Sequence, residues 1–415
     1  MNNIKFLPTL LMLVCCAPYI FADDDDQADI RENPNIEDTT TSIRIAREYP
    51  GYINREANHI DLNGDDWADL VKYLNMADSF PVNIVHIGDS HLQADMATSV
   101  VRNRLGSELG HLRGRGLVIP FKLAGTNQPY DYTITSNSEF TQSRLLKTPW
   151  PTAMSFTGIG IEPVNDTFDI TLHTQEKFDA LTVYFTGDSL QLIAANDSID
   201  VTYTCCIEEE GLLIEFGEEH SNVTLDLNAP NGTTIHGITA ELGCSGLAYH
   251  VIGNNGAQFS SYSGVSQMGK NVATLAPDLI IMSLGTNEAF GRFSKIEFRK
   301  QLDSFVSQII RTNPGAKLLL TTPSECQRRN RRRSRSKYYV NSNIALVREV
   351  ILEYAKDKHI PYYDWYEVSG GEGSSTKWVN DKNLNKDRIH MTRNGYQIQG
   401  ELFADALLEV LKPTI

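Results

Sequence analysis

The chain of 415 residues has few cysteines, fewer basic than acidic residues, and no long apolar run beyond its N-terminal region. No later stretch approaches the roughly 18 apolar residues that a membrane-spanning helix needs. Lys and Arg number 37 against 52 Asp and Glu, and the resulting charge of −15 disfavours a dedicated nucleic-acid-binding protein, which needs a basic face. CxxC and HExxH motifs are absent, so a zinc site has little support.

The first residues are typical of a secretory signal peptide. Lys5 precedes an apolar run at 6–16, and a small residue, Ala22, stands before four aspartates. This order of a charge, a short apolar core and a small residue predicts a signal peptide over 1–22, cleaved after Ala22. We therefore expect an exported protein, periplasmic or extracellular.

The residues in and after this segment bear on two further features, a lipid anchor and a linker. Lipoprotein anchoring through Cys15 or Cys16 has weak support, because Val14 and Cys15 stand where a small residue is expected. Residues 23–50 are polar and acidic without a periodic apolar pattern, and they predict a leader or linker.

The negative charge is concentrated in one segment. Residues 120–245 contain 4 basic and 18 acidic residues, a net charge of −14, and no Lys or Arg occurs from 178 to 269. Such a shift in composition indicates a separate domain. Its carboxylates suggest that the segment repels anionic polymers or holds a calcium ion.

Four cysteines remain after the signal peptide: Cys205, Cys206, Cys244 and Cys326. An exported chain permits disulfides. The first three lie in the acidic segment, so a bridge from Cys205 or Cys206 to Cys244 is expected, with at least one cysteine left free.

Apolar runs and helical spacings alternate outside the acidic segment. A helical pattern over 61–76 is followed by a buried strand over 82–87 and a helix over 92–109. Further strands are predicted at 279–284, 317–321 and 360–363, and further helices at 298–310, 344–354 and 396–411. This alternation is typical of an α/β domain.

The acidic segment alternates with the period of strands. The alternating stretches are 168–172, 181–185 and 223–227. Turn-forming residues separate them, as at 228–232. We expect an all-β sandwich over 111–245, inserted into an α/β domain that comprises 51–110 and 246–415.

Two motifs could carry a nucleophile and its base. Ser90, in Gly-Asp-Ser-His, stands where the first strand turns into its helix, the edge at which α/β sheets bind ligands. Asp387 precedes His390 by three residues, so it can orient the imidazole to accept a proton from a serine. Taken singly, the first motif is common turn chemistry and the second is more often a surface pair.

Two further positions could stabilise an oxyanion. Gly256 and Asn287 each follow a strand-like stretch. A glycine lets its N–H approach a ligand closely, and an asparagine amide supplies a second donor. The alternative for each is a turn or cap residue.

Together the motifs occur in the order Ser, Gly, Asn, Asp-x-x-His, and this order resembles the SGNH (GDSL-type) hydrolases. Gly-Asp-Ser-His-Leu-Gln-Ala-Asp, Leu-Gly-Thr-Asn-Glu-Ala-Phe and a glycine-rich stretch at 370–374 before Trp378 resemble the subgroup that contains bacterial peptidoglycan O-acetylesterases. In that subgroup a β-sandwich resembling a carbohydrate-binding module interrupts the hydrolase domain. The resemblance implies a flavodoxin-like three-layer α/β domain with an inserted sandwich. The G-x-S-x-G elbow of α/β-hydrolases is absent.

The resemblance also implies roles for the site residues. Ser90 is the expected nucleophile, His390 the general base and then acid, and Asp387 its orienting partner. The oxyanion hole is expected from the N–H groups of Ser90 and Gly256 and from the side chain of Asn287.

Three neighbours receive supporting roles. Asp89 and His91 are expected to support the turn at the nucleophile. Glu288 follows Asn287, at a position where many SGNH enzymes have Asp. No metal and no organic cofactor is implied.

The expected function is a secreted serine esterase that removes O-acetyl groups from a polysaccharide, with peptidoglycan as the leading substrate. Alternatives on the same scaffold are an esterase for plant or capsular polysaccharide and an O-acetyltransferase. A catalytically silent binding protein is disfavoured by the complete motif set. No nucleic-acid partner and no transmembrane segment are expected.

Seven basic residues crowd the run from Arg328 to Lys337. The simpler interpretation is a solvated loop between a strand and the next helix. The alternative is a contact for an anionic polymer, such as a cell-wall glycan or lipid headgroups.

Overall fold

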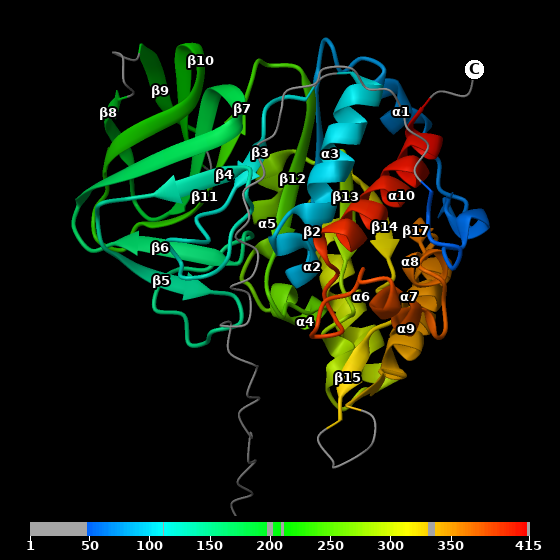
Figure 1. The fold of residues 1–415 in the computed structure, drawn as a ribbon. Coiled ribbons are helices and arrows are strands. Elements are labelled where there is room, and N and C mark those ends of the chain that lie inside the picture. Colours follow the sequence, from blue (N-terminus) through cyan, green and yellow to red (C-terminus); the bar gives the residue numbers. More distant parts are fainter. Residues whose placement is uncertain (1–47, 111, 197–201, 209–210, 331–336, 413–415) are drawn as a thin grey trace, which may run out of the picture. The chain divides into compact units, whose positions relative to one another are not determined.

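The structure is a computed structural model that describes residues 48–110, 112–196, 202–208, 211–330 and 337–412 (Figure 1). The predicted signal peptide and most of the predicted leader lie outside these residues. The fold described below belongs to the unit 49–415. In the described part of the chain no helix has the length and apolar character to cross a membrane.

A six-stranded sheet forms the centre of the α/β part, in the order β1-β17-β14-β13-β2-β12. Its strands are β1 (Ile60–Asp61), β2 (Pro81–Gly88), β12 (Gly246–Gly253), β13 (Leu279–Ser283), β14 (Lys317–Thr321) and β17 (Tyr362–Tyr363). All are parallel except β1, which pairs antiparallel with β17. Counted along the chain, the parallel strands lie in the order 2-1-3-4-5, which is flavodoxin-like. The predicted fold class is confirmed.

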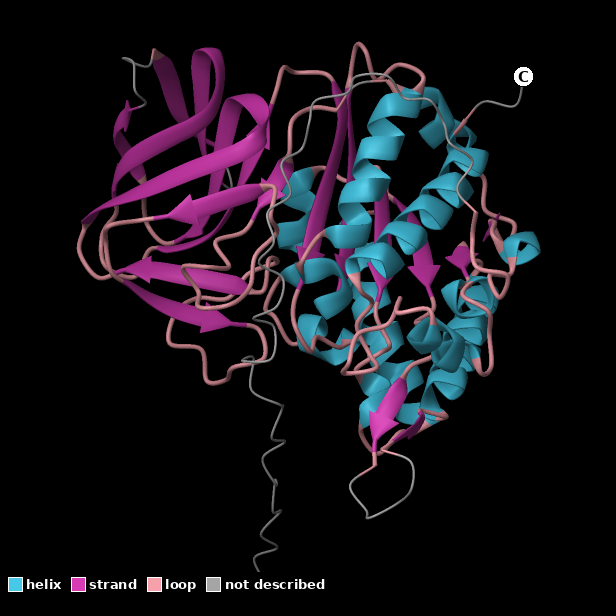
Figure 2. Cartoon of the chain, in the orientation of Figure 1, coloured by secondary structure: helices cyan, strands magenta, loops and turns pink. Residues whose placement is uncertain are grey.

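Helices cover both faces of this sheet because its buried strands are apolar on both sides. In β2, Val82 and Ile84 pack with α1, α3 and α10, whereas Val85 and Ile87 pack on the face covered by α4 to α7. Figure 2 shows helices on both sides of the sheet. The helices are α1 (Ala68–Leu74), α2 (Ser90–Gln93), α3 (Met96–Leu109), α4 (Phe259–Ser263), α5 (Met268–Val272), α6 (Lys295–Thr312), α7 (Asn343–Lys358), α8 (Trp365–Val368), α9 (Ser374–Asn380) and α10 (Arg393–Leu411).

Helix α6 shows why the sequence pattern predicts these elements. Ser294 caps its N-terminus by accepting a hydrogen bond from the N–H of Glu297. Its buried residues recur at helical spacing: Phe298, Leu302, Phe305, Val306 and Ile309. This single apolar stripe lies against the sheet, as the period of 3.6 requires.

Two predicted helices begin or break differently, at residues with left-handed backbone. The helix predicted over 61–76 starts only at Ala68, because Asp61 belongs to β1 and Asn63 (φ +53°) turns the chain. The helix predicted over 92–109 is divided into α2 and α3 at Asp95 (φ +54°). Asp95 tolerates this conformation because its carboxylate is fixed by buried partners.

The β-sandwich lies between β2 and β12 in the chain and consists of antiparallel strands. The strands are β3 (Gly116–Val118), β4 (Tyr132–Thr135), β5 (Phe140–Arg144), β6 (Ile159–Pro163), β7 (Thr167–Thr186), β8 (Gln191–Asn196), β9 (Tyr203–Glu208), β10 (Gly211–Asn228) and β11 (Thr234–Glu241). The strands predicted at 168–172 and 181–185 are one long strand, β7, whose first half pairs with β4 and whose second half pairs with β11. The limits 110/111 and 245/246 remain our proposal for the domain boundaries.

The predicted disulfide is wrong. Cys206 and Cys244 are exposed and unpaired, and Cys326 is buried and unpaired. The strand register explains why the bridge to Cys244 does not form: β9 is separated from β11 by β10 and β7. At about 4.8 Å per strand this is roughly 14 Å, whereas a disulfide needs Cα atoms within about 7 Å.

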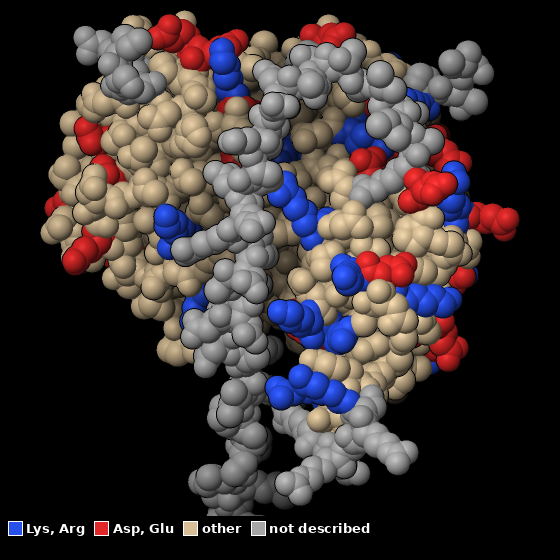
Figure 3. Space-filling view, in the orientation of Figure 1, with Lys and Arg blue, Asp and Glu red and all other residues tan. Residues whose placement is uncertain are grey.

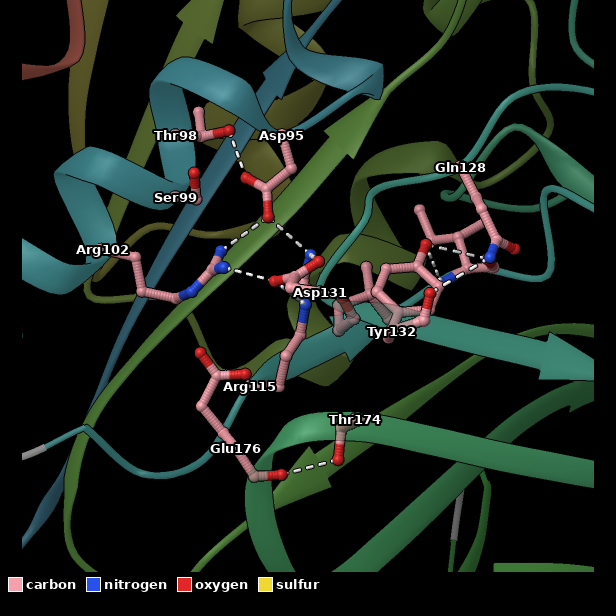
Figure 4. Close-up of polar contacts among 12 residues, drawn as sticks. Asp95, Thr98, Ser99, Arg102, Arg115, Gln128, Asp131, Tyr132, Thr174 and Glu176 are labelled. Atoms are coloured by element: carbon pink, nitrogen blue, oxygen red, sulfur yellow. Dashed lines mark hydrogen bonds and ion pairs between the residues drawn. The ribbon is translucent and has the colours of Figure 1, made fainter. Parts of the chain in front are cut away.

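A hydrophobic core and a buried ionic cluster join the sandwich to the α/β part. One apolar cluster contains Val85 of β2 together with sandwich residues such as Phe178. In the ionic cluster, Arg102 donates to Asp95 (2.8 Å) and to Asp131 (2.7 Å), and Arg115 donates to the same two carboxylates (2.6 and 3.1 Å; Figure 4). All four side chains are 4% exposed or less.

The remaining described elements are short. They are η2 (Arg55–Ala57), η3 (Ala273–Leu275), η4 (Glu288–Phe290) and the hairpin strands β15 (Gln327–Arg329) and β16 (Tyr338–Val340). The hairpin pairs antiparallel and holds the two ends of the basic run. Residues 331–336 of that run lie outside the described residues.

Candidate active site

Three neighbouring strands end level with one another at the point where the strand order reverses. Gly88 of β2 is the register partner of Gly253 in β12 and of Ser283 in β13. The loops that follow these strands therefore meet at one edge of the sheet. Open α/β sheets bind ligands at this switch point.

Ser90 is the first residue of α2, directly after β2. Asp89 caps the short helix, with its carboxylate accepting from the N–H of His91 at 2.9 Å. Gly88 permits the sharp turn, since a Cβ there would collide with Leu92 and come within 2.7 Å of the Ser283 carbonyl oxygen. The turn holds the serine at the carboxyl end of the strand.

His390 reaches Ser90 from the loop before α10. Its Nε2 accepts from Ser90 Oγ at 2.7 Å, and its Nδ1 donates to Asp387 Oδ2 at 2.7 Å. Asp387 Oδ1 also accepts from the N–H groups of Ile389 (2.8 Å) and His390 (3.0 Å). The turn requires Arg388 to adopt φ +69°. The structure thus brings together all three predicted triad residues.

The pKa values in this group favour a charged carboxylate beside a basic imidazole. Burial would lower the pKa of His390, but the hydrogen bond and the negative charge of Asp387, with Asp89 nearby, raise it overall above 6.5. Desolvation would raise the pKa of Asp387, yet its bonds to His390 and to the backbone hold it below its usual value.

His91 lies beside the catalytic pair and remains neutral. Its ring centroid is 5.1 Å from that of His390, and its Nδ1 is 3.1 Å from the Tyr396 hydroxyl. Burial and the neighbouring His390 lower the pKa of His91 to about 3. His91 therefore adds no competing positive charge at neutral pH.

Gly256 and Asn287 lie on the two loops beside Ser90. Gly256 adopts φ +79°, which a side chain disfavours, in the loop after β12. Asn287 Nδ2 donates to Asp89 Oδ2 (3.2 Å) and to the carbonyl oxygen of Ala257 (3.0 Å). The Asn287 amide therefore lies between the loop of Ser90 and the loop of Gly256, where an oxyanion donor is needed.

The carboxylates of Asp89 and Glu288 fix these loops by hydrogen bonds. Burial raises the pKa of Asp89 to about 6, and its carboxylate contacts both His91 and Asn287. The contact with Asn287 extends beyond the support of the turn that the sequence predicts. Glu288 accepts from the Phe259 N–H at 2.9 Å, and burial raises its pKa to about 8. Glu288 thus ties the loop after β13 to the start of α4.

Gln93 is a structural residue that the sequence reasoning missed. Its Oε1 accepts from the Asn255 N–H at 2.7 Å, directly before Gly256. Its Nε2 donates to the carbonyl and side-chain oxygens of Asn127 at 2.8 and 2.9 Å. Gln93 therefore connects the helix of the nucleophile to the Gly256 loop and to a loop of the insertion. The sequence signal that could have indicated Gln93 is its position in the motif Gly-Asp-Ser-His-Leu-Gln-Ala-Asp.

The glycine-rich stretch that supported the resemblance is held by a buried carboxylate. Glu325 accepts from the N–H groups of Gly373 and Ser375, each at 2.9 Å, and from the Ser375 hydroxyl at 2.6 Å. Trp378 closes this segment by donating to the carbonyl oxygen of Ser369 at 2.8 Å. These contacts hold the segment within the α/β part, and none of them involves a triad residue.

The described residues contain no group of three or more His, Cys, Asp or Glu side chains placed to hold a metal ion. The calcium hypothesis for the acidic insertion thus has no supporting cluster among these residues. A serine bonded to a histidine that is bonded to a carboxylate can instead act in acyl transfer.

A hydroxyl, imidazole and carboxylate at the switch point of a flavodoxin-like sheet have the geometry of a serine hydrolase. Residues 227–398 match the model of the GDSL-like Lipase/Acylhydrolase family. The match includes Gly256, Asn287, Asp387 and His390 and begins after Ser90. The chain thus contains a GDSL-like lipase/acylhydrolase domain and is a carboxylic ester hydrolase; its resemblance to the SGNH enzymes is confirmed.

A solved structure of a peptidoglycan O-acetylesterase is similar to this chain with a TM-score of 0.68 and 22% identity. The similarity covers 85% of this chain and 97% of that one, and at this identity it shows the fold. A lipase/acylhydrolase from Enterococcus faecalis matches over 41% of this chain and 80% of its own, with 22% identity and a TM-score of 0.31. An acetyl xylan esterase matches over 39% and 81%, with 17% identity and a TM-score of 0.31. No curated protein matches the chain.

Proposed function

We propose that this esterase is exported and removes O-acetyl groups from a polysaccharide, with peptidoglycan as its substrate. The observation that carries the chemistry is the continuous hydrogen-bonded path from Ser90 through His390 to Asp387. Peptidoglycan is supported as the substrate by the similar structure of a peptidoglycan O-acetylesterase, whose fold matches 85% of this chain. Export rests on residues 1–22 of the sequence.

In the proposed mechanism, Ser90 Oγ attacks the acetyl carbonyl carbon while His390 Nε2 takes its proton. The oxyanion accepts hydrogen bonds from the N–H groups of Ser90 and Gly256 and from Asn287, whose amide turns one N–H from the Ala257 carbonyl towards the substrate. His390 then protonates the sugar oxygen, and the sugar leaves.

Water completes the reaction. His390 takes a proton from the water, which attacks the acetyl-serine ester. The bond from Ser90 Oγ to the acetyl carbon then breaks, His390 returns the proton to Ser90 Oγ, and acetate is released. Throughout, Asp387 holds the imidazole in the required tautomer and balances its positive charge.

The decisive measurement is acetate release by the wild type and by Ser90→Ala on O-acetylated peptidoglycan, acetylated xylan and a chromogenic acetyl ester. We expect the wild type to prefer peptidoglycan and Ser90→Ala to lose at least about 10⁴-fold in kcat on every substrate, because the nucleophile is gone.

Phenylmethylsulfonyl fluoride should label Ser90 in the wild type, and circular dichroism should show that Ser90→Ala is folded. Unchanged turnover in Ser90→Ala would contradict the proposed mechanism with Ser90 as the nucleophile. A preference for xylan would instead favour the plant-polysaccharide esterase.

A further inference from the structure

Six Lys and Arg side chains lie on or beside the loop that carries Asp387 and His390. They come from this loop, from the first turn of α10 and from the β15–β16 hairpin. We name this set the basic rim: Arg328, Arg329, Lys337, Lys386, Arg388 and Arg393. Figure 3 shows Lys and Arg side chains gathered on the face of the α/β part in this region.

The hairpin and the catalytic loop are joined directly. The N–H of Gln327 donates to the carbonyl oxygen of Arg388 at 2.9 Å, and the Tyr338 hydroxyl donates to that of Lys386 at 3.0 Å. The Arg388 guanidinium lies 5.1 Å from the Tyr338 ring centroid, and the Lys337 ammonium lies 5.6 Å from it. One aromatic ring therefore gathers cations from both segments.

These cations have no carboxylate partner among the described residues, although other basic side chains of the protein do. Arg104 pairs with Asp405 at 2.8 Å, and Arg348 pairs with Asp364 at 2.6 Å. Four members of the basic rim are exposed, Arg329, Lys337, Lys386 and Arg393, whereas Arg328 donates to the carbonyl oxygen of Phe290. Neighbouring positive charges repel, so a group without carboxylate partners in a protein of net charge −15 indicates a surface for an anion.

The basic rim continues onto the insertion. The Arg393 guanidinium lies 5.4 Å from the ring centroid of Tyr130, which is 54% exposed. Tyr130 follows Asn127, the residue that Gln93 fixes beside the oxyanion loop. An exposed aromatic ring offers a flat apolar face to a sugar. The surface thus runs from the hairpin, past His390, to Tyr130.

We propose that the basic rim binds carboxylates that the polymer carries next to its O-acetylated sugars, so that the enzyme acts on an anionic glycan. This inference rests on the proposed esterase function. It favours substrate over membrane lipid because Lys386 and Arg388 flank Asp387 and Arg393 follows His390 by three residues, so a bound anion lies beside the ester. Peptidoglycan has such carboxylates on its stem peptides, whereas an unsubstituted acetylated xylan is neutral.

The test compares Lys386→Glu/Arg393→Glu with a matched control, Lys270→Glu/Arg311→Glu. The control residues are exposed and lie in α5 and near the end of α6, close to the edge where the sheet strands begin. Substrates are O-acetylated peptidoglycan, the same polymer with its carboxyl groups amidated, neutral acetylated xylan and a chromogenic acetyl ester.

We expect the rim variant to lower kcat/KM for peptidoglycan on the order of tenfold relative to the chromogenic ester, with the control at the wild-type ratio. Added salt and amidation should each lower wild-type activity on peptidoglycan in the same direction. An unchanged ratio in the rim variant, or an equal fall in the control, overturns the proposal.

Binding separates this inference from the proposed function. Ser90→Ala is sedimented with de-O-acetylated peptidoglycan and, separately, with vesicles of phosphatidylglycerol and phosphatidylcholine. Rim-dependent binding to peptidoglycan supports the basic rim even if no acetate release is found. Rim-dependent binding to the vesicles alone overturns it in favour of a lipid surface.

Discussion

At the scale of single residues, the site contains several ionisable groups, and the surroundings of each group determine whether it is charged. Asp387 receives hydrogen bonds from His390 Nδ1 and from two backbone N–H groups, so it stays ionised. The ring of His91 contacts that of His390, with the centroids 5.1 Å apart, and burial keeps His91 neutral. In the proposed mechanism, His390 is therefore the imidazole whose titration governs the reaction.

The pH dependence of activity follows from the raised pKa of His390. Only the neutral imidazole can accept a proton from Ser90, so kcat/KM should rise with pH through a midpoint above 6.5. In Asp387→Asn the attraction is lost, so the midpoint should move to lower pH. The maximal rate should fall roughly 10⁴-fold, because the imidazole loses its tautomer control.

The profile is measured as kcat/KM from about pH 5 to about pH 9 with the chromogenic ester. Lys382→Gln, an exposed neighbour on the same segment, is the control and should keep the wild-type midpoint. A midpoint that stays in place in Asp387→Asn would contradict the assignment of Asp387 as the partner of His390.

At the scale of elements, the site depends on three loops that are tied to one another by hydrogen bonds. Strands β2, β12 and β13 end level, and Gln93 of α2 holds the Asn255 N–H while contacting Asn127 of the insertion. Because Gly256 follows Asn255, the same contact fixes one of the proposed oxyanion donors.

Replacing Gln93 by Ala should therefore impair catalysis without removing a reacting group. We expect kcat to fall roughly 10- to 100-fold, because the Gly256 N–H shifts, with a smaller change in KM. The loss of buried partners should lower the free energy of unfolding by about 1–3 kcal/mol. Asn127→Ala keeps the bond from the Asn255 N–H to Gln93 and removes the Asn127 side-chain bonds to Gln93 and Asn255, so it should lose less in kcat. Equal losses would contradict this role of Gln93.

The same scale shows what could be predicted from the sequence. Apolar period was sufficient to predict four of the five parallel strands and α6, because this pattern is local. The site residues were proposed through the resemblance to the SGNH hydrolases, because each motif taken singly has a simpler interpretation. The break at Asp95 and the continuous β7 were missed, because tertiary partners stabilise them. The contact between Asp89 and Asn287 joins residues 198 positions apart, so no local pattern could indicate it.

At the scale of the whole molecule, the insertion and the α/β part are stabilised together. They share one apolar cluster, and the Arg102 and Arg115 guanidiniums lie between Asp95 of the α/β part and Asp131 of the insertion (Figure 4). We therefore expect both parts to unfold in one transition.

Asp131→Ala tests this coupling. It leaves two buried guanidiniums without one of their carboxylates, so the free energy of unfolding should fall by about 3–5 kcal/mol. Urea unfolding is followed by tryptophan fluorescence and far-UV circular dichroism, and the two curves should coincide and shift together. Lys177→Ala removes a surface pair with Glu219 whose side chains are 63% and 51% exposed, and it should change stability by less than about 1 kcal/mol. Two separate transitions would contradict the shared core.

The position of the insertion also has a consequence for how the chain folds. β2 and β12 are adjacent parallel strands, yet the entire sandwich lies between them in sequence. Its first and last strands pair, with Gly116 opposite Ala240, so a folded sandwich brings the two flanking strands close and shortens the loop that their pairing must close. During synthesis, when N-terminal segments emerge first, the sandwich should assemble before β2 gains either neighbour in the sheet. Ser90 is then made before the other two triad residues, Asp387 and His390, and meets them only when the C-terminal part of the chain has folded.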